Sequence, residues 1–314
     1  MTRAVLHADW SMRPQARWVV RGEDRGDGWT LSAPERWDAA RHMRVILEPG
    51  ADAVVAGFDV PLGVPAAWAA QAGIRSFRDL LGLLGDPAWP ELLEPAESAG
   101  QVGVRRPFYP RAPGGSRRDH LVQGLRLASA DDLLRACDRP VPGVMGAASP
   151  VFWLVGAQQV GKAAISAWRE VVAPAADEPH VRLWPFDGDL PGAAAAGTSV
   201  ICECYPRAAY EWPLGFPRTG WSKRRQADRR ARVADALAWI AASGARVRPD
   251  GGMRAALDDG FGPAPAGEDP FDATMGALQV IAVLEGLVPA GPDPAMPDAQ
   301  RAVEGWILGR PLQA

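Results

Sequence analysis

The sequence has few of the residues that build cross-linked or histidine-rich sites. Its 314 residues include four histidines and three cysteines, Cys137, Cys202 and Cys204. Three cysteines cannot make a disulfide scaffold. The histidines are scattered along the chain, so a histidine-rich metal site is not expected either.

Long apolar runs and an excess of charge are also missing. No stretch approaches the roughly 18 apolar residues of a membrane span, and the first residues lack the apolar centre of a signal peptide. The formal net charge is −3, so no global field draws the chain to nucleic acid or to a membrane. We therefore expect a cytoplasmic protein with no membrane partner, in which any basic site is local.

The composition that remains is that of an average globular protein. The chain is 47% hydrophobic and 23% charged, which excludes a mostly disordered protein. Apolar runs predict strands at residues 4–8, 16–21, 29–31 and 53–60, and helical spacing predicts a helix over 34–47. The last of these runs is apolar throughout, which is typical of a buried parallel strand.

The rest of the chain divides into a helical part and a mixed part. Residues 65–194 show helical spacing and few strand signals. A strand is predicted at 198–205, long helices at 223–242 and 270–287, and a last helix within 299–308. The expected architecture is an α/β core of a mixed sheet flanked by helices from residues 1–64 and 195–290, a helical insertion subdomain at 65–194, and a C-terminal helix at 291–314 that packs on the core.

Two carboxylates stand at the ends of predicted strands. Asp9 ends the first strand and Asp59 ends the fourth. If these strands are parallel neighbours, about 4.8 Å apart, both side chains emerge at one sheet edge and could share a divalent cation that prefers oxygen ligands. Two such ions about 4 Å apart suit phosphodiester hydrolysis. The alternative is that each Asp is only a turn former.

Further acidic residues occur later in the chain. Glu203 lies between Cys202 and Cys204 in a predicted strand, so alternation places it on the face opposite the cysteines. A charge there needs an ion partner or a metal. Asp269 and Asp272 open a long predicted helix, where they suit either capping and the helix dipole or a metal cluster.

Basic residues supply candidate contacts to phosphate. The candidates for substrate binding are Lys162, Arg207, Lys223, Arg225 and Arg229. The last three lie in a basic stretch that could grip phosphates or form a solvated helix face. Lys162 lies in residues 156–163, which resemble a phosphate-binding loop but carry Ala163 where that loop has Ser or Thr.

Three segments together resemble a known pattern. They read Gly57-Phe-Asp-Val-Pro-Leu-Gly-Val-Pro65, Glu203-Cys-Tyr-Pro-Arg-Ala-Ala-Tyr210 and Asp269-Pro-Phe-Asp-Ala-Thr-Met-Gly-Ala-Leu278. In this order they are similar to the signature segments of the domain-of-unknown-function 429 family. The turn after the first strand departs from the family, because it reads Asp9-Trp-Ser instead of a glycine-rich sequence.

The resemblance implies an RNase H-like fold, with three antiparallel strands followed by parallel ones, and a metal-dependent nuclease. It implies Asp9, Asp59, Glu203 and Asp272 as catalytic carboxylates. It implies Asp9, Asp59, Asp269 and Asp272 as metal ligands, with Mg²⁺ or Mn²⁺ as the cofactor.

The leading hypothesis is therefore a metal-dependent nuclease that hydrolyses DNA or RNA. One alternative is an ATP-binding protein of the same broad fold, similar to sugar kinases or actin, although the turn after Asp9 lacks the glycines of a phosphate loop. The other is a non-catalytic module that binds nucleic acid or protein. The oligomeric state is left open.

Overall fold

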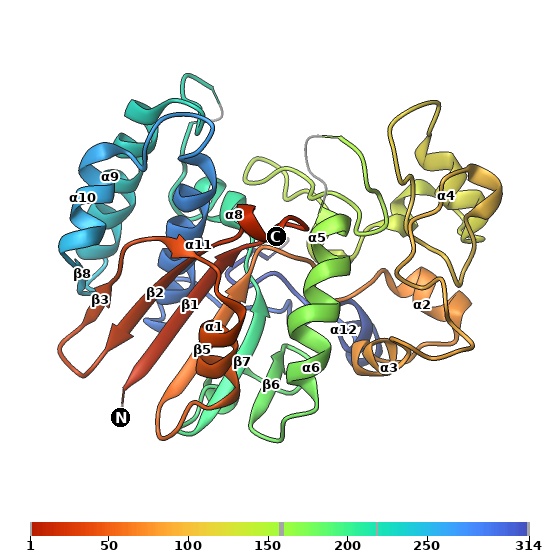
Figure 1. The fold of residues 1–314 in the computed structure, drawn as a ribbon, viewed down its shortest axis with the longest axis horizontal. Coiled ribbons are helices and arrows are strands. Elements are labelled where there is room, and N and C mark those ends of the chain that lie inside the picture. Colours follow the sequence, from red (N-terminus) through yellow and green to blue (C-terminus); the bar gives the residue numbers. More distant parts are fainter. Residues whose placement is uncertain (1, 157–159, 218, 313–314) are drawn as a thin grey trace.

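The computed structural model describes residues 2–156, 160–217 and 219–312. These residues form an α/β fold around one mixed eight-stranded sheet, in the order β6-β7-β5-β1-β2-β3-β8, with β4 paired to β2 (Figure 1). The strands are β1 (Arg3–Asp9), β2 (Trp18–Asp24), β3 (Trp29–Leu31), β4 (Glu35–Arg36), β5 (Ala53–Phe58), β6 (Val181–Trp184), β7 (Thr198–Glu203) and β8 (Val247–Pro249).

The sheet combines an antiparallel half and a parallel half. β1, β2 and β3 are antiparallel neighbours, whereas β5 is parallel to β1, and β7 and β6 continue the parallel half. The five strands predicted from apolar runs are confirmed, with ends that differ by at most three residues. β4, β6 and β8 were not predicted, and each has only two to four residues. The helix predicted over 34–47 begins at Ala39, because residues 35–36 form β4.

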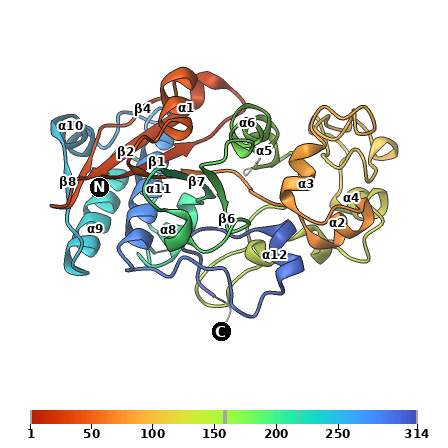
Figure 2. The ribbon, with the colours of Figure 1, turned by 90° about the horizontal axis from the view of Figure 1, so that it is seen from below.

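Helices cover both faces of the sheet, and others lie beside it. The helices of the described residues are α1 (Ala39–Leu47), α2 (Ala66–Ala72), α3 (Phe77–Gly82), α4 (Arg118–Gly124), α5 (Val160–Ala167), α6 (Ala173–Ala176), α7 (Leu190–Ala193), α8 (Pro206–Glu211), α9 (Gln226–Ala242), α10 (Gly251–Asp259), α11 (Glu268–Leu284) and α12 (Asp298–Glu304). α1, α5 and α6 lie on one side of the strands, and α8, α9 and α11 lie on the other (Figure 2). No helix in the described part of the chain is both long and apolar enough to cross a membrane.

Alternation in the central strands explains these two layers. Along β1, Leu6 and Ala8 belong to the hydrophobic cluster on the α1 and α5 side, whereas Val5 belongs to the cluster under α9 and α11. The adjacent β5 divides in the same way, because Ala56 joins the first cluster and Val55 the second. A strand buried on both faces reads as a continuous apolar run, which is what the sequence showed.

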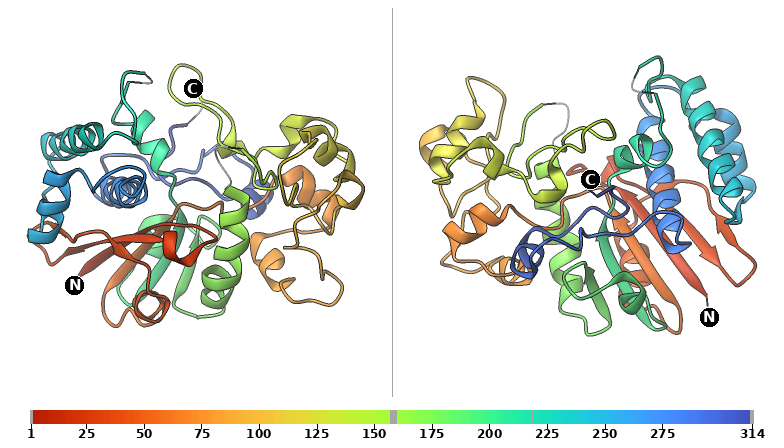
Figure 3. Two further views of the ribbon diagram at one scale, coloured as in Figure 1. Left: turned by 45° about the horizontal axis from the view of Figure 1, so that its top comes forward. Right: turned by 180° about the vertical axis from the view of Figure 1, so that it is seen from behind.

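The helical part predicted at residues 65–194 ends earlier than expected. α2, α3, α4 and the loops around them lie beside the sheet, next to α5 (Figure 3). Residues 181–184, however, form β6, which pairs with β7 inside the main sheet. The boundary at residue 194 was therefore wrong for the segment from β6 onward, because four residues are too few to show strand periodicity.

The C-terminal segment joins the two parts of the molecule. Its helix α12 packs against α2 and α3, so the helix at 291–314 was wrongly placed on the core. The residues after the helix do reach the core, since Ile307 forms a parallel bridge with Glu203 at the end of β7. The Leu308 N–H donates to the Glu203 carbonyl at 2.9 Å.

Helix α11 lies directly on β1 and β2, and a glycine permits this close approach. The buried His7 ring on β1 contacts the carbonyl oxygens of Ala273 and Cys204, each at 3.2 Å. Burial lowers the pKa of His7 to about 4, so the neutral ring donates only one hydrogen bond. A Cβ on Gly276 would overlap that ring.

We expect Gly276→Ala to destabilise the protein by about 1–3 kcal/mol, because an overpacked core must shift its backbone or adopt strained rotamers. Chemical denaturation measures the effect. Gly82→Ala is the matched control, since Gly82 also lies in a helix but its added Cβ meets no atom within 4 Å. The control should gain or keep stability because alanine favours helix. Equal behaviour of both variants would contradict this packing account.

Candidate functional site

Two carboxylates meet where β1 and β5 end. Asp9 is the last residue of β1, and Asp59 directly follows β5. The strands are parallel, with Ala8 opposite Phe58, and the Asp59 N–H donates to the Ala8 carbonyl at 3.0 Å. Both residues are half-buried. The prediction that these two residues share one sheet edge is confirmed.

Helix α11 brings a third carboxylate to this edge. Asp272 is buried in the first turns of α11. The Tyr210 hydroxyl on α8 donates to its Oδ1, and the Lys223 ammonium in the loop before α9 donates to its Oδ2. Asp269 lies one turn earlier and is partly exposed. We call Asp9, Asp59, Asp269 and Asp272 the acidic cluster.

The members of the acidic cluster repel one another. Burial raises the pKa of Asp9 well above its usual value, and the negative charges of Asp272, Asp59 and Asp269 raise it further. Burial is also the main cause that raises the pKa of Asp272, with Asp59 adding to it. Buried carboxylates of like charge resist ionisation. A cation at this edge of the sheet would therefore stabilise their charged forms.

The pKa values of Asp59 and Asp269 are raised as well. Burial raises the pKa of Asp59 to about 7, although the Lys223 charge opposes the rise. Burial raises the pKa of Asp269 as well, and Lys223, Arg36 and Arg13 oppose that rise. Lys223 is thus the cation common to both, and it partly neutralises the cluster.

Oxygen ligands of this kind fit Mg²⁺ or Mn²⁺ in chemistry. Within residues 2–156, 160–217 and 219–312, however, no three His, Cys, Asp or Glu side chains lie close enough together to hold a metal ion. An ion that bound here would compete with the Lys223 ammonium for Asp272.

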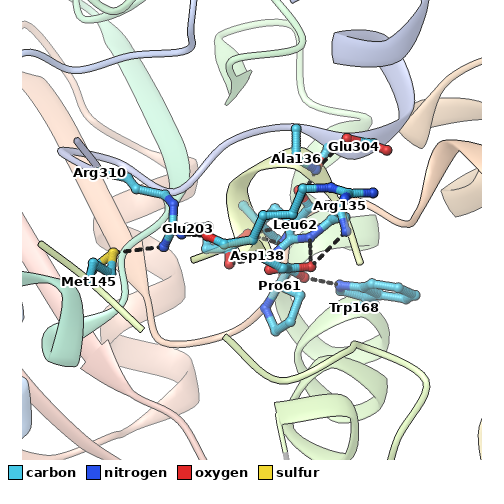
Figure 4. A network of polar contacts seen from close by, with 11 residues as sticks. Pro61, Leu62, Arg135, Ala136, Asp138, Met145, Trp168, Glu203, Glu304 and Arg310 are labelled. Carbon is cyan, nitrogen blue, oxygen red and sulfur yellow. Dashed lines mark hydrogen bonds and ion pairs between the residues drawn. The ribbon is translucent and has the colours of Figure 1, made fainter. Parts of the chain in front are cut away.

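Glu203 lies beside the acidic cluster but is engaged elsewhere. Its Oε2 and Oε1 accept from the Arg135 guanidinium at 2.6 and 2.8 Å, and Oε2 also accepts from the Leu62 N–H at 2.8 Å (Figure 4). Asp138 accepts from the same guanidinium. A buried carboxylate needs a partner, and Arg135 supplies it, so Glu203 is held in an ion pair in this structure; its catalytic role stays a prediction.

The Arg135 network links the two parts of the molecule. Glu304 on α12 accepts from the backbone N–H groups of Ala136, at 2.7 Å, and Ala66, at 3.0 Å. Arg135 lies in the helical part, and Leu62 follows Asp59 by three residues. The network (Figure 4) therefore fixes the segment that leaves the acidic cluster.

The predicted basic residues do not form one surface. Arg229 is buried and donates to the carbonyls of Gly260, Lys223 and Gly262, so its substrate-binding role was wrong. Its guanidinium instead fixes the loop that carries Lys223. Sequence alone could not reveal this, because two of the three carbonyls, those of Gly260 and Gly262, lie more than 30 residues away.

The other basic candidates are placed as follows. Arg225 is exposed and donates to Asp228 at 2.6 Å and to the Gly220 carbonyl at 2.7 Å. Arg207 pairs with Glu211 at 3.1 Å. Lys162 is partly exposed near the start of α5, on the opposite face of the sheet from α11.

The resemblance of residues 156–163 to a phosphate loop finds little support. Residues 157–159 lie outside the described residues. The apolar run 151–155 before them forms no strand of the sheet, and a Cβ on Gly161 would overlap the Val151 carbonyl. Gly161 is thus a packing glycine.

Three residues near the acidic cluster were not predicted. Tyr210 ends the second of the three segments that resemble the family signature, but nothing in its spacing marked it as a partner of Asp272. Arg13 follows Asp9 by four residues, and Arg36 lies opposite Trp18, the strand partner of Asp9. The position of Arg13 just after β1 was the one available signal. Comparison of the chain with family models, curated proteins and solved structures found no match.

Proposed function

We propose that the protein is an RNase H-like, metal-dependent nuclease of the kind that the domain-of-unknown-function 429 family implies. The observation that carries the proposal is the convergence of Asp9, Asp59 and Asp272 at one sheet edge, with raised pKa values caused by burial and mutual repulsion. The strand arrangement supports it too, because three antiparallel strands precede the parallel ones. The cytoplasm is the proposed location.

The proposed roles follow from the positions of the side chains. Asp9, Asp59 and Asp272 would hold Mg²⁺ or Mn²⁺, with Asp269 as an accessory. Such an ion, when bound, supplies an activated water and stabilises charge on the leaving oxygen. Tyr210 holds the Asp272 carboxylate in place. Lys223 pairs with Asp272, and its ammonium would be available to contact a phosphate if an ion took its place on that carboxylate.

Nothing favours the two alternatives to the same degree. An ATP-binding protein would need a phosphate loop after a strand, and residues 151–155 form none. A non-catalytic binding module has no reason to gather carboxylates of raised pKa at one edge, since perturbed groups of this kind concentrate at functional sites.

The proposal is tested with labelled single-stranded and duplex oligonucleotides incubated with Mn²⁺, Mg²⁺ or EDTA. We expect cleavage with either metal, none in EDTA, and a loss of about a hundredfold or more in Asp9→Asn, since even the loss of an outer partner of a metal ligand costs about 10–100-fold in metal affinity or activity.

The matched control for this assay is Asp298→Asn. Asp298 lies in the first turn of α12, and its side chain is 90% exposed. The control should cleave like the wild type. Full activity of Asp9→Asn, or cleavage that persists in EDTA, would contradict the proposed function.

A further inference from the structure

Two exposed arginines stand at the same sheet edge as the acidic cluster. Trp18 on β2 lies opposite Asp9 on β1, and Arg36 on β4 lies opposite Trp18. Neighbouring strands are about 4.8 Å apart, so the backbone of Arg36 is about 10 Å from that of Asp9. Arg13 lies in the connection between β1 and β2, four residues after Asp9. Both side chains point to solvent-accessible positions.

Arg36 is held in a defined place. Its guanidinium lies over the Trp18 ring, 4.0 Å from the centroid, and donates to the Gln15 carbonyl. A stacked guanidinium keeps free N–H groups at its edge, where they can reach a phosphate. Within the described ranges of the chain, no carboxylate lies within 4 Å of the Arg36 or Arg13 guanidinium.

The loop that carries Arg13 is fixed as well. Buried Arg17 donates to the Ser11 carbonyl at 2.6 Å and to Glu170 at 2.5 and 2.9 Å, and it lies 4.0 Å from the Trp10 ring. These contacts hold both ends of the loop. Arg13 therefore extends from an anchored turn.

The charges on either side of the acidic cluster are complementary to a polyanion. Arg13 and Arg36 flank it on the β2 side, while Lys223 and the highly exposed Arg224 flank it in the loop before α9. The first pair and Lys223 all act on the pKa of Asp269, so positive charge from both sides reaches the cluster. A strand that crosses the carboxylates needs cations beside them, because the carboxylates repel phosphate.

We propose that Arg13 and Arg36 bind consecutive phosphates of a nucleic-acid strand that lies across the acidic cluster. The inference rests on the proposed function and adds to it the side on which the strand enters. Arginine contacts to phosphate are charge-assisted and often bidentate. They position the strand without reading its sequence, so binding by this pair is independent of base sequence.

The test is the salt dependence of oligonucleotide binding, measured in EDTA by fluorescence anisotropy. Each phosphate contact contributes about 0.7 to the slope of log K against log salt for a single strand, and about 0.9 for a duplex. Arg13→Gln combined with Arg36→Gln should lower the slope by about 1.4 or about 1.8, and weaken binding roughly tenfold at low salt. Which slope change occurs tells single strand from duplex.

Two further variants make the test specific. Arg13→Lys combined with Arg36→Lys keeps the charge and should keep the slope. Arg25→Gln combined with Arg248→Gln changes two exposed arginines at the other end of the sheet, one in the β2–β3 turn and one on β8, and should behave like the wild type. Melting temperatures of all variants check that the fold is kept.

Failure of this inference is distinguishable from failure of the proposed function. An unchanged slope in the double Gln variant, or no binding by the wild type, would overturn the role of Arg13 and Arg36. Metal-dependent cleavage with an unchanged salt slope in the double Gln variant would support the nuclease function and indicate that another surface binds the strand. A slope change without any metal-dependent cleavage would support the arginine pair and overturn the nuclease.

Discussion

Mn²⁺ is expected to raise the melting temperature of the wild type, and Asp59→Asn is expected to abolish most of that rise. An ion that binds only the folded protein stabilises it, by about 2.7 kcal/mol at a concentration of about 100 Kd. The amide in the variant removes one negative ligand from the acidic cluster. Thermal melts of both proteins, with and without metal, measure the difference.

The same substitution should leave the metal-free protein unchanged or more stable at neutral pH. The pKa of Asp59 is raised from 3.8 to about 7, so the folded state binds this proton more tightly than the unfolded state does. Its contribution is therefore fully present below about pH 4 and is lost as pH rises through 7. A shift of this size corresponds to at most roughly 4 kcal/mol.

The dependence of stability on pH gives a second test of the role of Asp59. Between pH 5 and pH 8, the stability of the metal-free wild type should fall more steeply than that of Asp59→Asn. Asp298→Asn, with its exposed carboxylate, should follow the wild type. If Mn²⁺ shifted wild type and Asp59→Asn equally, the ion would be binding elsewhere. A variant less stable by about 1 kcal/mol, with no metal effect in either protein, would identify Asp59 as a turn former.

Arg135→Met should produce the largest loss of stability, about 3–5 kcal/mol. Arg135 and its partners Glu203 and Asp138 are buried, and removing one partner of a buried ion pair leaves the other charge uncompensated. Burial already raises the pKa of Glu203 against the stabilising effect of Arg135. Denaturant unfolding of the variant measures the loss.

Two comparisons separate the effect of breaking the ion pair from the effect of removing side-chain volume in Arg135→Met. Arg25→Met removes an arginine whose side chain is 76% exposed and should cost no more than about 0.5 kcal/mol. Glu203→Gln in the Arg135→Met background removes one of the two carboxylate charges left unpaired, so the double variant should lose less than the sum of the single losses. Additive losses would contradict the proposed network.

The sequence predicted those features that depend on short-range pattern. The apolar runs of β1 and β5 located both strands, and the Asp after each run located one edge of the sheet. Parallel pairing then required the two carboxylates to meet. The helix opened by Asp269 was predicted from its capping residues, although the structure begins it at Glu268.

Features that depend on distant partners were not predictable in the same way. Glu203 and Arg229 are residue types expected in a functional site. In the structure Glu203 pairs with Arg135, and Arg229 donates to three loop carbonyls. β6 and β8 are too short to show a period. Tyr210 reaches Asp272 only because α8 packs against α11, a contact that neither sequence segment encodes alone.

The central claim is that the carboxylates at the ends of β1 and β5 and in the first turns of α11 bind a divalent cation. The most direct test is a crystal structure of the protein in Mn²⁺, with the ion located by its anomalous scattering. The account predicts manganese on the carboxylates of Asp9, Asp59 and Asp272, with the Lys223 ammonium displaced from Asp272. Manganese found only elsewhere, with Lys223 still paired to Asp272, would contradict it.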